Sequence, residues 1–363
     1  MLTRTTILFF VFVALAAASA DVHFKSPTPD LRYRAPQLAS APGMVAVAFG
    51  AGNSVYVATS KDQGQSFSKP IKVFETSVLP LSRHRGPRIA ITSGAIVVTA
   101  VTGKTIATGP HAHGLPSDGD LFSWRSTDSG KTWSQPIRIN EVPSSSREGL
   151  HTLAADGKGN VFAAWLDLRK KGTHLYGAFS SDAGATWSPN VEIYESPGGT
   201  ICECCHPSAT YGKDGAVYVM WRNSISGDRD MYLTSGNSSR GFGKAEKLGT
   251  GSWKLNACPM DGGGIARDGE RTITAWRRGT EIFMAEPGQS ETRLGEGKDV
   301  ALAVAKGQTY AVWVAGTQLE SWISGKREVL STKAAFPTLM ALPGGGMLAA
   351  WDEDDGIALR HLP

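Results

Sequence analysis

The sequence predicts an all-β protein, a β-propeller of four-stranded antiparallel blades, on the evidence of two repeated patterns. The first is the eight-residue motif Ser-x-Asp-x-Gly-x-Thr/Ser-Trp/Phe at 60–67, 126–133 and 180–187. The second is a short strand of β-branched and aromatic residues that follows a Gly-rich turn, with roughly 50 residues per unit. This strand occurs at 45–49, 96–101, 161–165, 217–221, 272–276, 310–313 and 347–351. Seven such strands favour seven blades, with six as the alternative.

Each copy of the motif is expected to join two antiparallel strands. The Asp carboxylate can accept hydrogen bonds from backbone N–H groups of its own turn, and the Gly can adopt a positive φ. The aromatic residue then packs the turn onto the adjoining sheet. The residues with these structural roles are Asp62, Gly64, Asp128, Gly130, Trp133, Asp182, Gly184 and Trp187. A degenerate fourth copy lies at 234–242.

These motifs resemble the Asp-box (BNR) repeats of sialidase-like β-propellers. The segment Tyr33-Arg34-Ala35-Pro36 resembles the Tyr/Phe-Arg-Ile-Pro opening of sialidases, and 336–351 resembles their last repeat. Cys-Glu-Cys-Cys-His-Pro at 202–207, with Ala-Cys-Pro-Met-Asp-Gly at 257–262, resembles a group of exported bacterial sialidase-related proteins. That last resemblance brings no established activity. Together the resemblances imply a single Asp-box propeller domain over 21–363.

Residues 1–20 are typical of a secretory signal peptide, because Arg4 precedes an apolar run at 7–17 and Ala18-Ser19-Ala20 offers a cleavage site. We therefore expect a secreted or periplasmic protein with no membrane span after cleavage. The net charge of +4 is small for 363 residues, and no basic block occurs, so nucleic acid is not an expected partner.

The start of each innermost strand should lie at one mouth of the channel. Aligning the repeats brings several arginines, histidines and carboxylates to this mouth. The residues expected to bind a glycan or a small anionic ligand there are Arg34, Arg85, Arg88, Arg147, Glu148 and His151. Cys205, His206, Met260, Asp261, Asp299 and Phe336 align at the same level. For any single arginine the alternative is a structural ion pair.

Sialidase chemistry requires an arginine triad for the substrate carboxylate, a Tyr nucleophile activated by Glu, and an acid/base Asp. Arg34 matches the first arginine of the resemblance, and Glu148 could stand for the Glu. The turn at 49–54 contains neither a second Arg nor an Asp, and Phe336 stands at the Tyr position. We therefore expect true sialidase activity to be absent.

Two other functions stay open. One is an exo-acting glycoside hydrolase on extracellular glycans that uses two carboxylates. Its candidate catalytic residues are Arg34, Arg85, Glu148 and Asp261, with Asp299 as a further carboxylate. The other is a scaffold that binds protein partners. The sequence does not decide whether the protein is an enzyme.

The four cysteines allow three interpretations. Disulfides would pair Cys202 with Cys205 and Cys204 with Cys258, which avoids a strained bond between adjacent residues. A metal site would use the four thiols with Met260 and with His206 or His151, a ligand set that suits copper or another soft metal. Covalent haem is the third, because Cys202-x-x-Cys205-His206 matches the c-type motif, but a tight propeller loop disfavours it. The alignment places Cys202 and Cys258 at the same depth in neighbouring blades.

Overall fold

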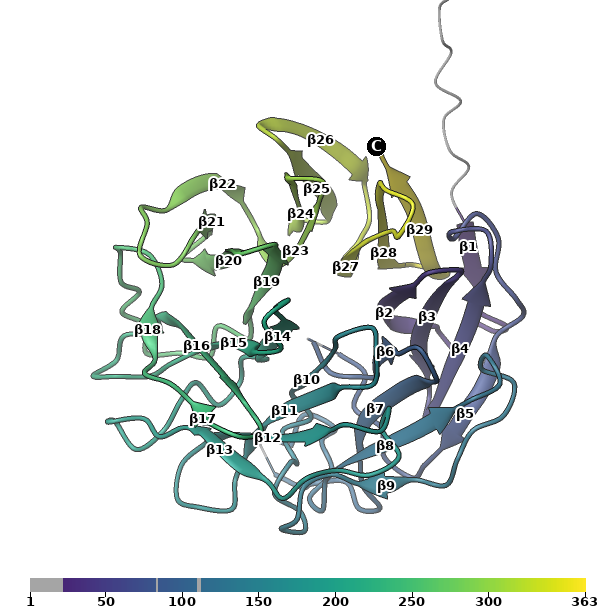
Figure 1. The fold of residues 1–363 in the computed structure, drawn as a ribbon, viewed down its shortest axis with the longest axis horizontal. Coiled ribbons are helices and arrows are strands. Elements are labelled where there is room, and N and C mark those ends of the chain that lie inside the picture. The colour runs from purple at the N-terminus through teal and green to yellow at the C-terminus, as the bar shows by residue number, and fades with distance from the viewer. Residues whose placement is uncertain (1–21, 83, 110–111) are drawn as a thin grey trace, which may run out of the picture.

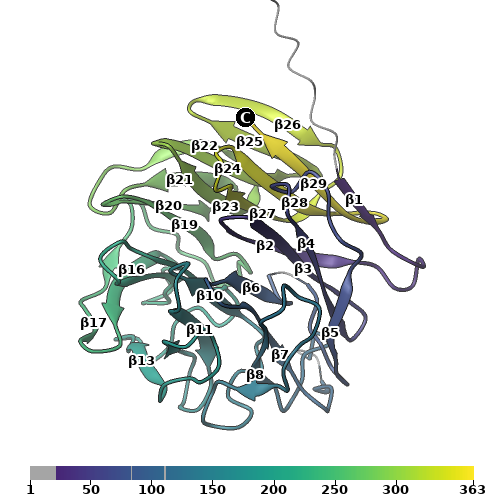
Figure 2. The same cartoon turned by 45° about the vertical axis from the view of Figure 1, so that its right-hand side comes forward.

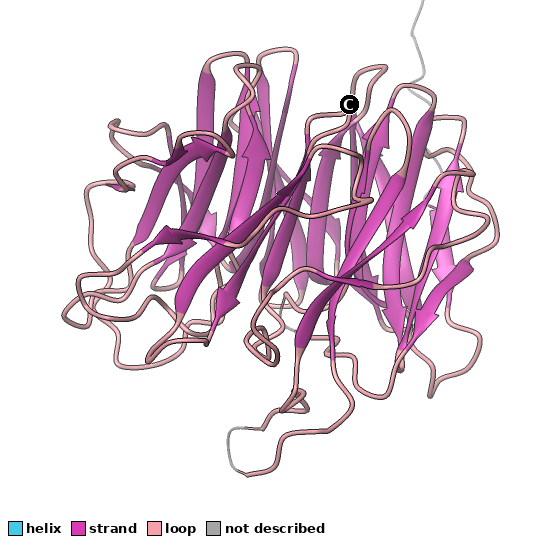
Figure 3. Ribbon diagram, turned by 60° about the horizontal axis from the view of Figure 1, so that its bottom comes forward, coloured by secondary structure: helices cyan, strands magenta, loops and turns pink. Residues whose placement is uncertain are grey.

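A computed structural model describes residues 22–82, 84–109 and 112–363, and over these residues it contains strands and turns without a helix. The strands form seven antiparallel sheets, six of four strands and one of five, arranged in a ring (Figure 1). The strands run between two faces covered by loops (Figure 3). The predicted seven-bladed β-propeller is therefore confirmed. The predicted signal peptide lies outside the described residues.

Within a blade the strands follow one another from the channel outward. Blade 1 contains β2 (Arg34–Ala41), β3 (Met44–Ala51), β4 (Ser54–Ser60) and β5 (Ile71–Glu75). Blade 2 contains β6 (Arg88–Ile91), β7 (Ile96–Thr102), β8 (Asp120–Ser126) and β9 (Ile137–Arg138). Blade 3 contains β10 (His151–Ala155), β11 (Val161–Asp167), β12 (His174–Ser180) and β13 (Val191–Tyr194). Blade 4 contains β14 (Ser208–Tyr211), β15 (Val217–Arg222), β16 (Met231–Asn237), β17 (Gly241–Phe242) and β18 (Glu246–Lys247).

The remaining blades complete the ring. Blade 5 contains β19 (Gly263–Asp268), β20 (Arg271–Arg278), β21 (Glu281–Ala285) and β22 (Thr292–Glu296). Blade 6 contains β23 (Lys298–Ala305), β24 (Gln308–Ala315), β25 (Gln318–Ile323) and β26 (Lys326–Ser331). Blade 7 contains β27 (Ala335–Ala341), β28 (Met347–Glu353), β29 (Gly356–Leu362) and the N-terminal strand β1 (Val22–Lys25).

All seven strands predicted from the second pattern are the second strands of blades. Most of their residues are buried, because each sheet packs between two neighbouring sheets and both of its faces lie in the core. This burial explains why they read as continuous apolar runs. Four of them carry a Trp that is at most 1% exposed: Trp165, Trp221, Trp313 and Trp351.

The Asp-box turns join the third and fourth strands of blades 1, 2 and 3. In the first box Asp62 Oδ1 accepts hydrogen bonds from Ser60 Oγ (2.6 Å) and Ser66 N (2.9 Å), and Gly64 N donates to Ser60 Oγ (2.8 Å). Gln63 and Gly64 both have positive φ, 61° and 87°, which gives the tight hairpin turn. The other two boxes repeat this geometry. In the degenerate fourth copy Asn237 Oδ1 replaces the carboxylate.

The aromatic residue of each box packs against the preceding blade. Trp187 of blade 3 donates its indole N–H to Ser123 Oγ of blade 2 at 2.9 Å. Phe67 of blade 1 packs against the core that blade 1 shares with blade 7. The boxes therefore fasten neighbouring blades to each other, as the motif predicts.

Both ends of the chain build blade 7, so the ring is closed by hydrogen bonds (Figure 2). The N-terminal strand β1 pairs antiparallel with β29, with Val22 opposite Leu359. The ring of Phe24 lies 5.5 Å from the rings of both Phe49 and Phe67. The closing strand is thus held by an aromatic cluster as well as by its ladder.

Candidate functional site at the channel mouth

Left-handed backbone recurs where the innermost strands begin. Outside glycine, φ is 55° at Ala35, 66° at His84, 56° at Met260, 58° at Asp299 and 49° at Phe336. The register of β2, β23 and β27 shifts at the same points. Such conformations cost about 1–3 kcal/mol each and cluster at functional sites. This end of the channel is therefore the candidate functional region.

Three of the side chains at this mouth come from three blades, one of which lies across the ring from the other two, which are neighbours. His84 precedes β6, Asp261 precedes β19, and Asp299 lies in β23. One ligand atom of each lies within 4.8 Å of the others. His84 Nε2 is 2.8 Å from Asp299 Oδ1, and the backbone N–H of Asp299 donates to Asp261 Oδ2 at 3.0 Å. This group, the His–Asp cluster, spans the mouth of the ring.

The two carboxylates of the His–Asp cluster differ in proton affinity. Burial raises the pKa of Asp261, and the neighbouring Asp299 adds to the rise. For Asp299 burial acts in the same direction, but the hydrogen bond and charge of His84 outweigh it and lower its pKa. Asp261 is 1% exposed, and its Oδ1 has no hydrogen-bond partner.

Arg34 lies at the junction of blades 1 and 7. Its Nε is 3.6 Å from Asp352 Oδ2, and its guanidinium lies 5.9 Å from the ring centroid of Phe336. Asp352 Oδ1 accepts the backbone N–H of Ala35 at 2.8 Å. Burial raises the pKa of Asp352 to about 7, although Ala35 and Arg34 act in the opposite direction. Arg34 therefore lies next to Asp352, whose raised pKa favours the neutral carboxylic acid, and next to Phe336, whose ring has no hydroxyl group.

Arg85 is paired with the carboxylate predicted to share its site. Arg85 is 5% exposed, its Nε donates to Glu148 O at 2.6 Å, and its Nη2 is 3.7 Å from Glu148 Oε2. Burial raises the pKa of Glu148, opposed by Arg85 and Arg147, and Arg147 is exposed beside it. Arg88 donates to the backbone carbonyls of Pro87 and His84. The structure therefore gives Arg34, Arg85 and Arg88 separate neighbours rather than one common anion clamp.

The expectation that His151 faces the mouth is wrong. His151 is the first residue of β10, is 0% exposed, and its Nε2 is 3.0 Å from Thr99 Oγ1. Burial, with the charge of Arg88, lowers its pKa to about 3, so its imidazole is neutral. Alignment found the correct strand start, but the side chain points into the packing between blades 2 and 3.

The cysteines form a second cluster beside the His–Asp cluster. The Sγ atoms of Cys202, Cys204 and Cys205 lie within 4.8 Å of one another, and the residues are 0%, 6% and 1% exposed. Cys202 Sγ is 2.9 Å from Cys205 Sγ and 3.8 Å from Cys204 Sγ. Met260 packs against them. We call these three cysteines with Met260 the sulfur cluster.

Cys258 lies at the edge of the sulfur cluster. Its thiol interacts with Cys204 and lies 3.7 Å from Glu203 Oε1, but unlike Cys202 it is exposed. The expectation that Cys202 and Cys258 lie at equal depth is therefore wrong. All four cysteines are free thiols in this structure, so neither expected disulfide is formed in it.

A buried arginine links the two clusters. Arg222, at the end of β15, is 1% exposed and donates to the backbone carbonyls of Asp261 (3.0 Å), Arg229 (2.6 Å) and Arg277 (2.8 Å). Hydrogen bonds from Cys204 and Cys205 lower the pKa of Cys202 well below its usual range, and the charge of Arg222 adds to the effect. The charge of Arg222 therefore favours the thiolate form of Cys202.

The channel contains a cavity of about 220 Å³ below the mouth. Its lining includes His84, Arg88, His206 and Thr152. The His206 ring stacks on His84 with centroids 4.0 Å apart, and His206 Nδ1 accepts the backbone N–H of Gly262 at 3.2 Å. Burial, His84 and Arg88 lower the pKa of His206. A small solute in the channel would therefore meet two stacked imidazole rings and a guanidinium.

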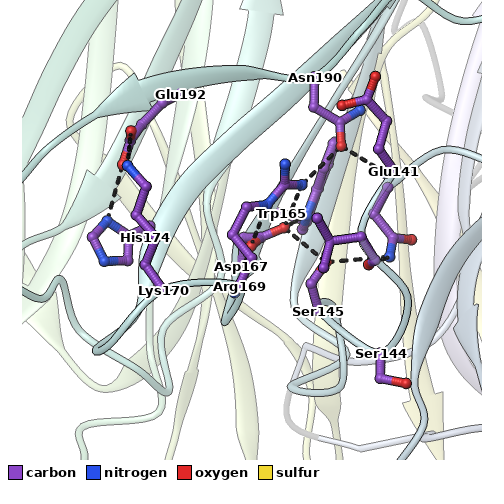
Figure 4. A network of polar contacts seen from close by, with 12 residues as sticks. Glu141, Ser144, Ser145, Trp165, Asp167, Arg169, Lys170, His174, Asn190 and Glu192 are labelled. Atoms are coloured by element: carbon purple, nitrogen blue, oxygen red, sulfur yellow. Dashed lines mark hydrogen bonds and ion pairs between the residues drawn. The ribbon is translucent and has the colours of Figure 1, made fainter.

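A large polar network in blade 3 has a structural role (Figure 4). Both oxygens of Asp167 are bonded to Arg169, and Oδ2 also accepts from Trp165 Nε1 and Ser145 Oγ. Blade 7 repeats the bond between Trp and the acid two residues later. Because its hydrogen-bonding groups are satisfied internally, Asp167 offers no site to a ligand.

Sequence reasoning missed His84, Asp352 and Arg222. His84 directly precedes Arg85, a residue of the predicted site, and this position could have drawn attention to it. Asp352 and Arg222 each directly follow the Trp of a second strand, which is a shared position. No local pattern shows that these two side chains are buried.

No known family profile matches this chain, and no curated protein matches it. Among solved structures, an ulvan lyase of a new polysaccharide lyase family is similar at 13% identity and a TM-score of 0.57, over 94% of this chain and 95% of that one. An α-L-arabinanase from Penicillium chrysogenum is 13% identical with a TM-score of 0.52, over 95% and 98%. A Hadza microbial sialidase is 13% identical with a TM-score of 0.51, over 87% and 75%.

These likenesses support the fold assigned from the repeats. The similarity extends over nearly the whole chain, whereas the identity is too low to transfer a site. The chain therefore has the propeller fold that is also found in sialidases and in related polysaccharide-acting proteins.

Proposed function

We propose that this protein is an exported propeller that binds Cu(I) through the thiolates of Cys202, Cys204 and Cys205. The observation that carries the proposal is the convergence of three buried sulfur atoms, with the Met260 thioether packed against them. Thiolate and thioether are soft ligands and select Cu(I) over hard cations. The signal peptide predicted at residues 1–20 and the position at the channel mouth fit a protein that meets its ligand outside the cytosol.

The spacing of the sulfurs supports the proposal. Two thiolates bound at about 2.3 Å in trigonal or tetrahedral geometry are about 3.8–4.0 Å apart. Cys202 Sγ and Cys204 Sγ are 3.8 Å apart. Cys205 Sγ, at 2.9 Å from Cys202 Sγ, must move by about an ångström to complete the set.

Export to an oxidising compartment limits the states that the four cysteines can adopt. In an oxidising compartment, cysteines are usually bonded to each other as disulfides or bound to a metal. The competing state is therefore a Cys202–Cys205 disulfide, with Cys204–Cys258 as the second bond. Zinc is the competing metal, with Cys258 as a fourth ligand. Covalent haem is disfavoured because Cys202 and Cys205 are buried and present no surface to a porphyrin.

Two experiments separate these states. Anaerobically reduced protein is titrated with Cu(I) from a chromophoric chelator, with Cys202→Ser, Cys205→Ser and Met260→Leu as variants. We expect one Cu(I) per chain, loss of binding in the cysteine variants and weaker binding in Met260→Leu. Met44→Leu is the matched control, because Met44 packs in the core of blades 1 and 2, away from the sulfurs.

The native state of the cysteines is read from protein isolated from the oxidising compartment. A metal site predicts that a chelator lowers the melting temperature, since binding stabilises only the folded form. Disulfides predict that a reductant lowers it instead, because a Cys204–Cys258 bond would stabilise by about 3–4 kcal/mol. If reduced protein binds no Cu(I), or if Cys202→Ser binds it as well as wild type, the proposal is wrong.

A glycan-processing propeller is the second candidate, and one pair of residues favours it. Glu148 combines a raised pKa with a side chain that is 26% exposed and lies beside Arg85. A carboxyl group with a raised pKa at the rim could serve as a general acid. The structural neighbours named as a lyase, an arabinanase and a sialidase support tests on acidic polysaccharides and arabinans. Reducing-end release by wild type that is lost in Glu148→Gln would support this function.

Sialoside hydrolysis is not part of either proposal. Phe336, not a tyrosine, lies beside Arg34, and this supports the inference that the sialidase nucleophile is missing. Robust cleavage of a sialoside that is lost in Arg34→Ala would contradict it. A scaffold role has little support, since the large exposed apolar residues within the described chain, Ile106, Val142 and Val329, lie in separate segments. None of the described secondary structure is a helix suited to crossing a membrane.

A further inference from the structure

The His–Asp cluster shares no residue with the sulfur cluster and has a different donor set. Its members are His84 from blade 2, Asp261 from blade 5 and Asp299 from blade 6. Segments from opposite sides of the ring therefore meet through the contact between His84 and Asp299. No ordinary core packing requires an imidazole and two carboxylates at this point.

We propose that His84, Asp261 and Asp299 bind a divalent cation through nitrogen and oxygen. This is a second site, independent of the proposed Cu(I) site. One ligand atom of each residue lies within 4.8 Å of the other two. Two ligand atoms each about 2.1 Å from one ion at a right angle are about 3.0 Å apart. The 2.8 Å between His84 Nε2 and Asp299 Oδ1 fits two ligands of one ion.

The polar groups of the cluster are under-satisfied without an ion. A carboxylate can accept about four hydrogen bonds, yet Asp261 accepts one, from the backbone of Asp299. Its Oδ1 is buried without a partner, and Asp261 forms no ion pair within the described residues. Leaving such a group buried and unpaired is costly. A cation would supply the missing partner and neutralise both carboxylates.

The donor set defines the class of ion. Imidazole with two carboxylates suits Mn²⁺ or Zn²⁺, whereas Cu(I) favours the sulfur cluster. His84 and His206 also line the channel cavity. Water can therefore reach the His84 side of the cluster and complete the coordination shell, as in sites that keep an open position.

Mn²⁺ is the probe because it is a hard ion with little affinity for thiols and gives an EPR signal when free. Full-length mature protein is titrated with Mn²⁺, and the free ion is followed by EPR. We expect one Mn²⁺ per chain and, in Asp261→Asn and Asp299→Asn, at least about a tenfold loss of affinity. Asn at position 299 also tolerates the positive φ of 58°.

Two controls make the test specific. Asp352→Asn removes a different buried carboxylate of the same mouth and should leave Mn²⁺ affinity unchanged. Cys202→Ser should also leave it unchanged, even if it abolishes Cu(I) binding. Melting curves confirm that each variant is folded, and added Mn²⁺ should raise the melting temperature of wild type but not of Asp299→Asn.

Two results would overturn the proposal. One is that folded wild type binds no Mn²⁺ and is not stabilised by it, which would mean that a proton rather than an ion occupies the carboxylate pair. The other is that Asp261→Asn and Asp299→Asn both bind Mn²⁺ as wild type does. The Cu(I) titration tests different residues from the Mn²⁺ titration. A negative Mn²⁺ result therefore does not contradict the proposed Cu(I) binding, and a negative Cu(I) result does not contradict the proposed divalent-cation site.

Discussion

The burial of Asp352 predicts the direction in which the free energy of unfolding changes with pH. Burial raises the pKa of Asp352 from 3.8 to about 7. Between these two pH values the folded protein keeps a proton that the unfolded chain releases. The contribution of this group to stability is therefore complete below pH 3.8 and is lost as the pH rises to about 7. At about 1.4 kcal/mol per pKa unit, the whole window amounts to about 4 kcal/mol.

Asp352→Asn removes this pH dependence. Asn is neutral at every pH, and its side-chain oxygen can still accept the backbone N–H of Ala35. Below pH 3.8 the variant and wild type should have nearly the same free energy of unfolding. Above pH 7 the variant should be the more stable, by up to about 4 kcal/mol, because wild type must bury an ionised carboxylate.

Urea unfolding followed by Trp fluorescence at a series of pH values measures this difference, and other titrating groups cancel between the two proteins. Arg34→Gln is the control: it removes the nearby charge and should widen the pH dependence of wild type. The reasoning is refuted if Asp352→Asn is less stable than wild type at high pH and the deficit grows with pH. In that case Asp352 is ionised in the folded protein and its pair with Arg34 is net stabilising.

Two further predictions concern the Asp-box turns, and both are checked by chemical denaturation. Gly184→Ala should destabilise by about 2–4 kcal/mol, because φ is 79° and a new Cβ would lie 2.9 Å from Val97. Gly157→Ala, at φ 75° with open space around it, should cost only the backbone term of about 1–2 kcal/mol, and equal losses would contradict the packing argument. Trp187→Phe should cost about 1 kcal/mol by removing the bond to Ser123. Ser123→Ala should then add little in the Trp187→Phe background, and full additivity would show that the bond is not the cause.

Local patterns determined the fold of this protein. An Asp-box places its Asp, Gly and hydroxyl residues within a few positions of each other, so the turn that they form is encoded by a short segment. The second strands are buried on both faces, so their apolar runs mark each blade without reference to the rest of the chain. Even the closure of the ring follows from pairing between the two ends, although the sequence did not show that β1 supplies the outer strand.

The arrangement of the side chains at the channel mouth could be learned only from the tertiary structure. Alignment correctly found the starts of the innermost strands, but a bulge or a left-handed residue there changes which way the next side chain points. Asp261 and Asp299 therefore meet His84 from across the ring, whereas His151, at an equivalent start, is buried between blades. Contacts with other blades decide which sulfurs are buried and which carboxylate keeps a proton. No single segment of the sequence contains the burial and the charges that these contacts create.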